Sequence, residues 1–160
     1  MKNSLTFLLR AYLAQHHPDL LFEVERENGV NAFIAAAIES LGDQPDELAR
    51  QGTPAYVIEE ICMEQLTQGF RPSRYDYLLS LLEDEFNATF AVWAERDLLS
   101  SVVLILLRDC GTVFDRFGFC EQNEDDEQLR DEMITVIQRS LRTPDSVRQV
   151  DLLLERVLDN

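Results

Sequence analysis

The densest group of apolar residues in the chain lies at 98–107, inside a longer segment at 86–110. Its apolar positions recur at spacings of three and four residues, which predicts the buried face of an α-helix. These positions are Leu98, Leu99, Val102, Val103, Leu106, Leu107 and Cys110. Leu104 and Ile105 lie off this stripe, so the helix is either packed on two sides inside a bundle or offers apolar surface to a partner.

The same segment does not fit a transmembrane helix. Such a helix needs about 20 consecutive apolar residues, whereas Ser100 and Ser101 interrupt this shorter run. Charged residues also stand on both sides of it, at 95–97 and 108–109. We therefore interpret the segment as a core helix.

Helical spacing of apolar residues recurs along the rest of the chain, and no stretch shows the sustained alternation of a strand. The predicted fold is all-α: one helical domain over 1–160, with about seven to eight helices around a central helix near 89–117. The other helices are expected at 5–17, 19–26, 30–41, 54–68, 73–86, 126–141 and 143–158, with at most a short helical turn at 43–51.

Two helix ends carry recognisable signals. Ser73, with Asp76 three residues later, approximates a capping box at the start of a helix. At the other signal, Gly118 is expected just past the end of the central helix, where Phe119 can pack on Phe114 in a Schellman ending. We expect the central helix to continue through Gly111, although a stop and restart at that glycine is the alternative.

The charge of the chain narrows the choice of partners. It has 30 acidic and 14 basic residues, a formal net charge of −16. This charge disfavours direct binding to nucleic acid and to anionic membrane surfaces, both of which require basic side chains. A protein partner or self-association remains open.

Cysteine usage and the N-terminal segment indicate the compartment. Three cysteines, an odd number without a CxxC pair, argue against a disulfide framework and favour a reducing cytoplasm. The first apolar stretch is broken by Arg10 and has no small-residue cleavage site, so it is interpreted as an amphipathic helix and not a signal peptide. The expected location is the cytoplasm.

No residue pattern points to catalysis, a cofactor or a metal. His16 and His17 are adjacent, about 100° apart on a helix, and are interpreted as surface histidines near a helix end. Cys62 and Cys110 lie on apolar faces and are expected in the core, whereas Cys120 is expected to be more exposed. The acidic segment at 121–127 lacks the calcium-loop pattern and is interpreted as a solvated loop.

The segment Gly69-Phe70 through Ser73-Arg74-Tyr75-Asp76, and on to Leu82 and Glu85-Phe86, carries a resemblance. Within a short acidic helical chain it resembles an uncharacterised family of small proteins encoded on conjugative transposons and related mobile elements of Bacteroidetes. The similarity covers the N-terminal two-thirds of the chain. The resemblance implies a helical fold and an accessory role in the bacterial cytosol, and it transfers no site residues.

The sequence does not reveal a biochemical activity. The leading hypothesis is a non-enzymatic accessory or protein-interaction protein of a bacterial mobile element. Its predicted partner surface consists of Leu104, Ile105, Phe114, Phe117 and Phe119. One alternative is an acidic nucleic-acid mimic that binds a DNA-binding or restriction protein, favoured by uneven charge: 18 acidic and 8 basic residues at 81–160 (net −10) against 12 and 6 at 1–80 (net −6). A small hydrolase using Cys120 or a pair of carboxylates is the remaining class.

Overall fold

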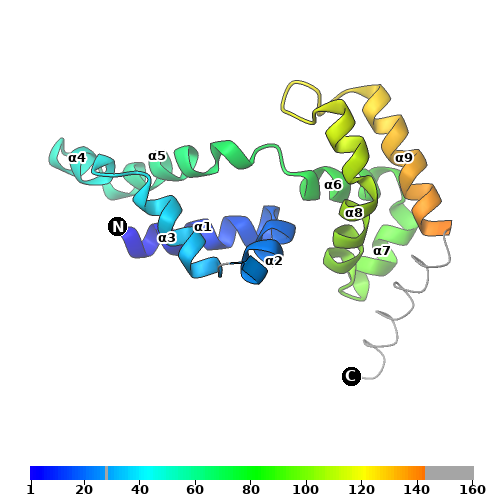
Figure 1. The fold of residues 1–160 in the computed structure, drawn as a ribbon, viewed down its shortest axis with the longest axis horizontal. Coiled ribbons are helices and arrows are strands. Elements are labelled where there is room, and N and C mark those ends of the chain that lie inside the picture. Colours follow the sequence, from blue (N-terminus) through cyan, green and yellow to red (C-terminus); the bar gives the residue numbers. More distant parts are fainter. Residues whose placement is uncertain (28, 143–160) are drawn as a thin grey trace. The chain divides into compact units, whose positions relative to one another are not determined.

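The computed structural model describes residues 1–27 and 29–142, which form nine α-helices, a short 3₁₀ turn and no strand (Figure 1). This confirms the predicted all-α fold. The helices are α1 (Lys2–His16), α2 (Pro18–Glu27), α3 (Val30–Glu39), α4 (Gln44–Arg50), α5 (Ala55–Thr67), α6 (Arg74–Glu85), α7 (Asn87–Glu95), α8 (Leu99–Phe117) and α9 (Glu127–Arg142), with the 3₁₀ turn η1 at Gln68–Phe70. The helix predicted at 143–158 lies outside the described residues.

The chain divides into two compact units, Met1–Arg71 and Pro72–Asn160. At the boundary Arg71 is extended (φ −94°, ψ 144°), as expected of a residue that precedes proline. A single domain over 1–160 stays a prediction, and each unit is described by itself below.

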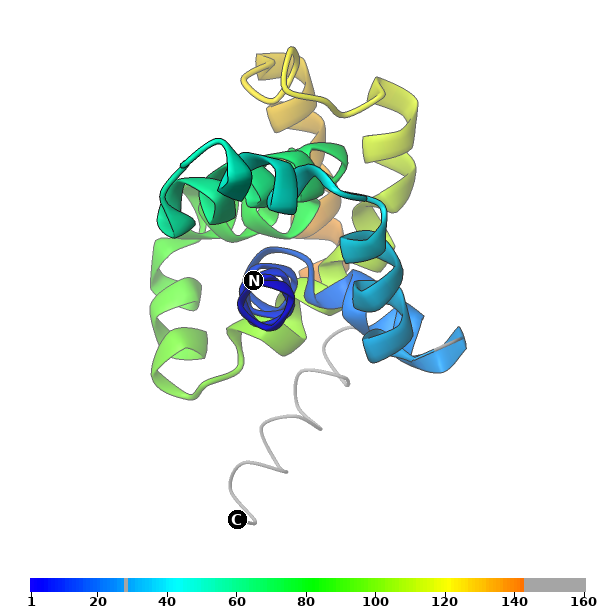
Figure 2. The same ribbon diagram turned by 90° about the vertical axis from the view of Figure 1, so that its left-hand side faces the viewer.

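In the first unit, α1 packs against α2, α3 and α5, and α4 packs against α5. Figure 2 looks along α1 from its N-terminal end. Leu5, Leu9 and Leu13 recur every four residues on one face of α1 and are fully buried. They meet apolar side chains of α3 and α5, among them Ile34, Ile58 and Cys62.

In the second unit, α8 is the central helix, in contact with α6, α7 and α9. Its buried residues are Val102, Val103, Leu106, Cys110, Val113 and Phe114, which overlap closely with the predicted stripe. The main helices packed on it contribute Leu78 and Leu82 from α6 and Met133 and Ile137 from α9 to the same core. The prediction of a core helix here is confirmed.

The expected single helix near 89–117 is corrected by the structure, which has α7 and α8 in its place. Asp97 lies in the left-handed region (φ 58°) between them. The Leu98 amide donates to the Trp93 carbonyl (2.8 Å) and the Asp97 amide to the Ala94 carbonyl (3.2 Å), the two bonds of a Schellman ending. Leu98 and Trp93 both enter the core, and this burial offsets a left-handed aspartate that costs about 1–2 kcal/mol.

The two predicted helix-end signals are found in the second unit. The Asp76 amide donates to the Ser73 hydroxyl (3.0 Å) at the start of α6. Gly118 ends α8 in the left-handed conformation (φ 61°). The rings of Phe114 and Phe119 then lie 4.9 Å apart between centroids. α8 is also continuous through Gly111, as expected.

Candidate functional site

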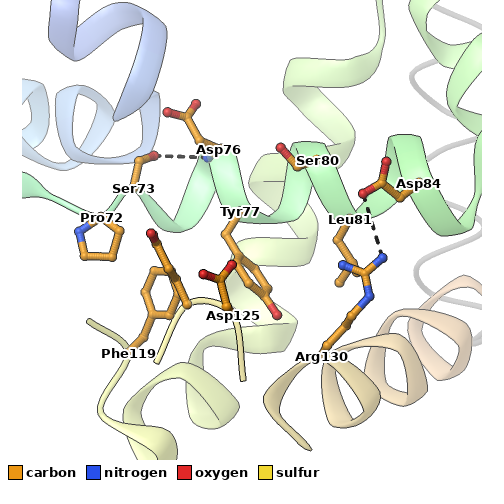
Figure 3. A pocket seen from close by; sticks show the side chains of 11 residues that line it. Pro72, Ser73, Asp76, Tyr77, Ser80, Leu81, Asp84, Phe119, Asp125 and Arg130 are labelled. Atoms are coloured by element: carbon orange, nitrogen blue, oxygen red, sulfur yellow. Dashed lines mark hydrogen bonds and ion pairs between the residues drawn. The ribbon is translucent and has the colours of Figure 1, made fainter. Parts of the chain in front are cut away.

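A pocket of about 420 Å³ opens in the second unit between α6, the segment after α8 and the first turn of α9 (Figure 3). Its volume lies within the range of about 300–1,000 Å³ that is usual for ligand sites. The lining is mostly polar and contains four carboxylates and one guanidinium. It consists of Pro72, Ser73, Asp76, Tyr77, Ser80, Leu81, Asp84, Phe119, Glu124, Asp125 and Arg130.

One face of α6 forms the long wall of the pocket. Residues three or four positions apart on a helix share a face, and this spacing places Ser73, Asp76 or Tyr77, Ser80 and Asp84 along the same side. The Ser73 cap fixes where this wall begins, because it satisfies the Asp76 amide in the first turn.

Asn123 positions the opposite wall. Its Oδ1 accepts a hydrogen bond from the Cys120 amide (2.8 Å), and its Nδ2 donates to the carbonyls of Phe117 (2.9 Å) and Gly118 (3.2 Å). One side chain thus joins the end of α8 to the segment that follows it. The residues next to it, Glu124 and Asp125, line the pocket as a consequence.

Arg130 supplies the positive charge at the pocket's edge. Its guanidinium donates to Glu85 (2.8 Å) and lies 3.8 Å from Asp84. The hydrogen bond to Glu85 raises the pKa of Arg130 above its already high ordinary value. These neighbours offset the charge of Arg130, so the surplus charge of the lining is negative.

Tyr77 provides an aromatic wall and a buried hydroxyl. Its ring makes edge contacts with Phe119 (5.1 Å) and Phe114 (5.7 Å between centroids). The hydroxyl is buried and has no hydrogen-bond partner among the described residues. Burial raises the pKa of Tyr77, so the phenol is protonated at neutral pH and can donate a hydrogen bond.

This arrangement suits binding of a cationic side chain. Carboxylates attract a guanidinium or ammonium group, and the aromatic rings of Tyr77 and Phe119 add a surface on which a cation can lie. Within 1–27 and 29–142, no cluster of three or more histidine, cysteine, aspartate or glutamate side chains is arranged to hold a metal.

The residues of the predicted partner surface differ in how deeply they are buried. Phe114 is fully buried in the core, so its side chain offers no area to a partner. Leu104, Ile105, Phe117 and Phe119 are partly buried, and the last two pack against the core. Phe119 is the member of this group that lines the pocket.

Sequence reasoning did not identify Tyr77, Asn123 or Arg130 as site residues. Tyr77 and Arg130 are far apart in sequence, and no local pattern connects them. Asn123 follows a glycine-terminated helix within a polar loop, which is a recognisable context for a side chain that caps backbone groups. That context is the one sequence signal available for these three residues.

The two histidines differ from the predicted surface pair. His16 is partly buried, whereas His17 is buried, with 9% of its surface exposed. The rings of Tyr12 and Phe70 lie 5.6 Å from the His17 ring between centroids. The 3₁₀ turn that brings Phe70 to His17 follows α5, so this contact is tertiary and has no signal near residue 17.

The cysteines lie as expected. Cys62 and Cys110 are buried and Cys120 is partly exposed, and all three are free thiols. Burial, together with the neighbouring charge of Asp109, raises the pKa of Cys110 to about 12. Burial also raises the pKa of Cys62. The two core thiols are therefore poor nucleophiles.

The helices within residues 1–27 and 29–142 include none with the length and apolar character needed to cross a bilayer. Comparison with curated proteins and with solved structures gave no match. A family model described as a domain of unknown function, DUF1896, matches residues 4–143. The match extends across both compact units. Because it covers most of the chain, the protein belongs to the DUF1896 family.

Proposed function

We propose that the protein is a non-enzymatic interaction protein that binds a basic segment of a partner protein in the bacterial cytoplasm. The pocket of the second unit carries this proposal. Four carboxylates (Asp76, Asp84, Glu124 and Asp125) and a single arginine, Arg130, line it, and Arg130 already contacts Asp84 and Glu85. A partner's arginine or lysine would be attracted by the net negative charge of this lining.

A contact of the same kind already exists inside the second unit. The guanidinium of Arg74 lies 5.0 Å from the centroid of the Phe114 ring. The same group pairs with Asp115 at 2.9 Å. The pocket offers an incoming cation the equivalent combination, with Tyr77 and Phe119 as rings and Asp84 and Asp125 as carboxylates.

An accessory role on a mobile element is part of the same proposal and rests on the resemblance carried by residues 69–86. The three free cysteines support the cytoplasmic location. Leu104 and Ile105, both partly buried on α8, stay predicted partner contacts.

The test measures binding of short labelled peptides by fluorescence anisotropy. Arginine-containing and lysine-containing peptides are compared with otherwise identical peptides that carry glutamine at the same positions. We expect the basic peptides to bind more tightly, and their affinity to fall with rising salt because the contacts are exposed.

A pair of matched variants locates the binding site. The double variant Asp84→Asn with Asp125→Asn removes two pocket charges. The control, Glu39→Gln with Glu60→Gln, removes two charges from exposed positions in the first unit. Equal loss of affinity in the two variants would show attraction to net charge alone and refute a site in this pocket. Preference for the glutamine peptides would refute the proposal altogether.

A further inference from the structure

A second hollow lies entirely within the first unit, between α2 and α3. It has a volume of about 520 Å³ and is lined by Leu20, Glu23, Val24, Glu27, Ala32, Phe33 and Ala36. Its α2 residues follow the i, i+3, i+4, i+7 spacing of one helix face, and its α3 residues lie within a single turn of one another. The hollow is therefore a groove along two neighbouring helices.

Most of the side chains that line the groove are apolar, and the groove is open to solvent. α2 has no buried residue, although it contains leucines, a valine and a phenylalanine. Leu20, Val24 and Phe33 are only partly buried in the groove. Ala32 and Ala36 are exposed and small, so another backbone can approach α3 closely.

The charges at the groove all have the same sign. Glu23 and Glu27, its two charged lining residues, are one helical turn apart on α2 and exposed. No basic side chain lines the groove within the described residues. A second copy of this chain is a poor occupant, because each copy carries a net charge of −16 and the two would repel.

We propose that this groove binds an amphipathic helix with a basic flank from a partner protein. The apolar face of that helix lies on Leu20, Val24 and Phe33, close to the alanines of α3. Its lysines or arginines then pair with Glu23 and Glu27. This is the helix-in-groove mode of recognition, in which apolar anchors one turn apart enter a groove between helices.

This inference goes beyond the pocket of the second unit and does not depend on it. The occupant is bound largely through apolar contacts, whereas the pocket binds an isolated cationic side chain. The two sites therefore differ in salt dependence, because salt screens exposed charges but leaves apolar contacts in place.

The test uses the full chain and a labelled peptide of roughly 15 residues, about four helical turns. The peptide has leucines on one face and lysines beside them, and a scrambled peptide of identical composition is the comparison. We expect the amphipathic order to bind at least about tenfold more tightly than the scrambled order, which is a difference of about 1.4 kcal/mol. Part of that affinity should persist at high salt.

Variants assign the binding to the groove. Glu23→Lys with Glu27→Lys reverses its charge, and Ala36→Phe fills it from an exposed position. Each should weaken binding about tenfold, equivalent to about 1.4 kcal/mol. The control Asp46→Lys with Glu60→Lys makes the same charge change at exposed positions of α4 and α5 and should have a much smaller effect. Circular dichroism confirms that each variant is folded.

Three results would overturn the inference. The first is that the scrambled peptide binds as tightly as the amphipathic one. The second is that both groove variants retain the affinity of the unchanged chain. The third is that the free chain dimerises and Ala36→Phe abolishes the dimer, which would make a second copy the occupant. The pocket variant Asp84→Asn with Asp125→Asn is measured in parallel. If it alone loses binding, the groove is refuted while the proposed function stands.

Discussion

Replacing Asn123 by alanine should loosen one wall of the pocket without changing its charge. The substitution removes the bonds to the Cys120 amide and to the carbonyls of Phe117 and Gly118. A typical intramolecular hydrogen bond contributes about 0.5–1.5 kcal/mol to stability. The bonds at 2.8 and 2.9 Å are partly buried, and the third, at 3.2 Å, is exposed and counts for less. We expect the free energy of unfolding to fall by about 2 kcal/mol.

Urea denaturation followed by tryptophan fluorescence measures this loss. Trp93 is the single tryptophan of the chain. It is 5% exposed and belongs to the core of the second unit, so its emission reports unfolding of that unit. The midpoint should move to lower urea with an unchanged slope, because the surface exposed on unfolding stays the same.

Asn87→Ala is the matched control. The Asn87 side chain donates one long hydrogen bond, 3.4 Å to the Glu83 carbonyl, at an exposed position of the same unit. Its loss should cost less than about 0.5 kcal/mol. If Asn123→Ala is no more destabilising than this control, Asn123 does not organise the wall. Basic peptides should also bind more weakly to Asn123→Ala, although the substitution removes no charge. Unchanged affinity would show that the segment held by Asn123 does not contribute to the binding site.

Two further outcomes follow from the described contacts. Ser73→Ala should lower the free energy of unfolding by about 1 kcal/mol, because it removes the cap on the Asp76 amide. Ser73→Asp should retain most of the stability that the cap contributes, because aspartate also caps helices. Equal losses of stability in the two variants, measured by the same urea titration, would contradict the role of the cap. Cys110 links stability to alkaline pH, because its pKa is raised from 9.0 to about 12 in the folded protein. Below pH 9 the thiol is protonated in both states, and above it the unfolded thiol ionises first, so stability falls between pH 9 and 12 by at most about 1.4 kcal/mol per pH unit. Cys110→Ala should flatten this fall, and an unaltered slope would rule out the linkage.

The sequence predicted helix ends well where glycine stands at the left-handed position. Gly118 and Asp97 terminate α8 and α7 through the same pair of backbone bonds, yet the prediction included the first ending and missed the second. A glycine in the sequence predicts a left-handed position because glycine adopts that conformation without strain. Aspartate gives no such signal, and at Asp97 the conformation is selected by burial of Leu98 against the core.

Less of the candidate site than of the fold could be predicted from the sequence. Periodicity identified the buried face of α8 because burial on a helix repeats along the chain. The pocket brings together Tyr77 and Arg130, which stand on different helices and share no repeat. The burial of Phe114 was also missed, because its place beside Phe117 and Phe119 looks like an aromatic patch until the packing of α6 on α8 is known.

The position of the buried cysteines has a practical consequence. Cys62 lies in the core of the first unit and Cys110 in that of the second, so each unit contains one protected thiol. A thiol reagent reaches such a group only when its surroundings open, and the labelling rate then gives a free energy of local opening. A variant that retains Cys62 but not Cys110 therefore reports the opening free energy of the first unit. A variant that retains Cys110 but not Cys62 reports that of the second unit. Equal opening free energies would identify one cooperative domain over the whole chain, and unequal values would identify two.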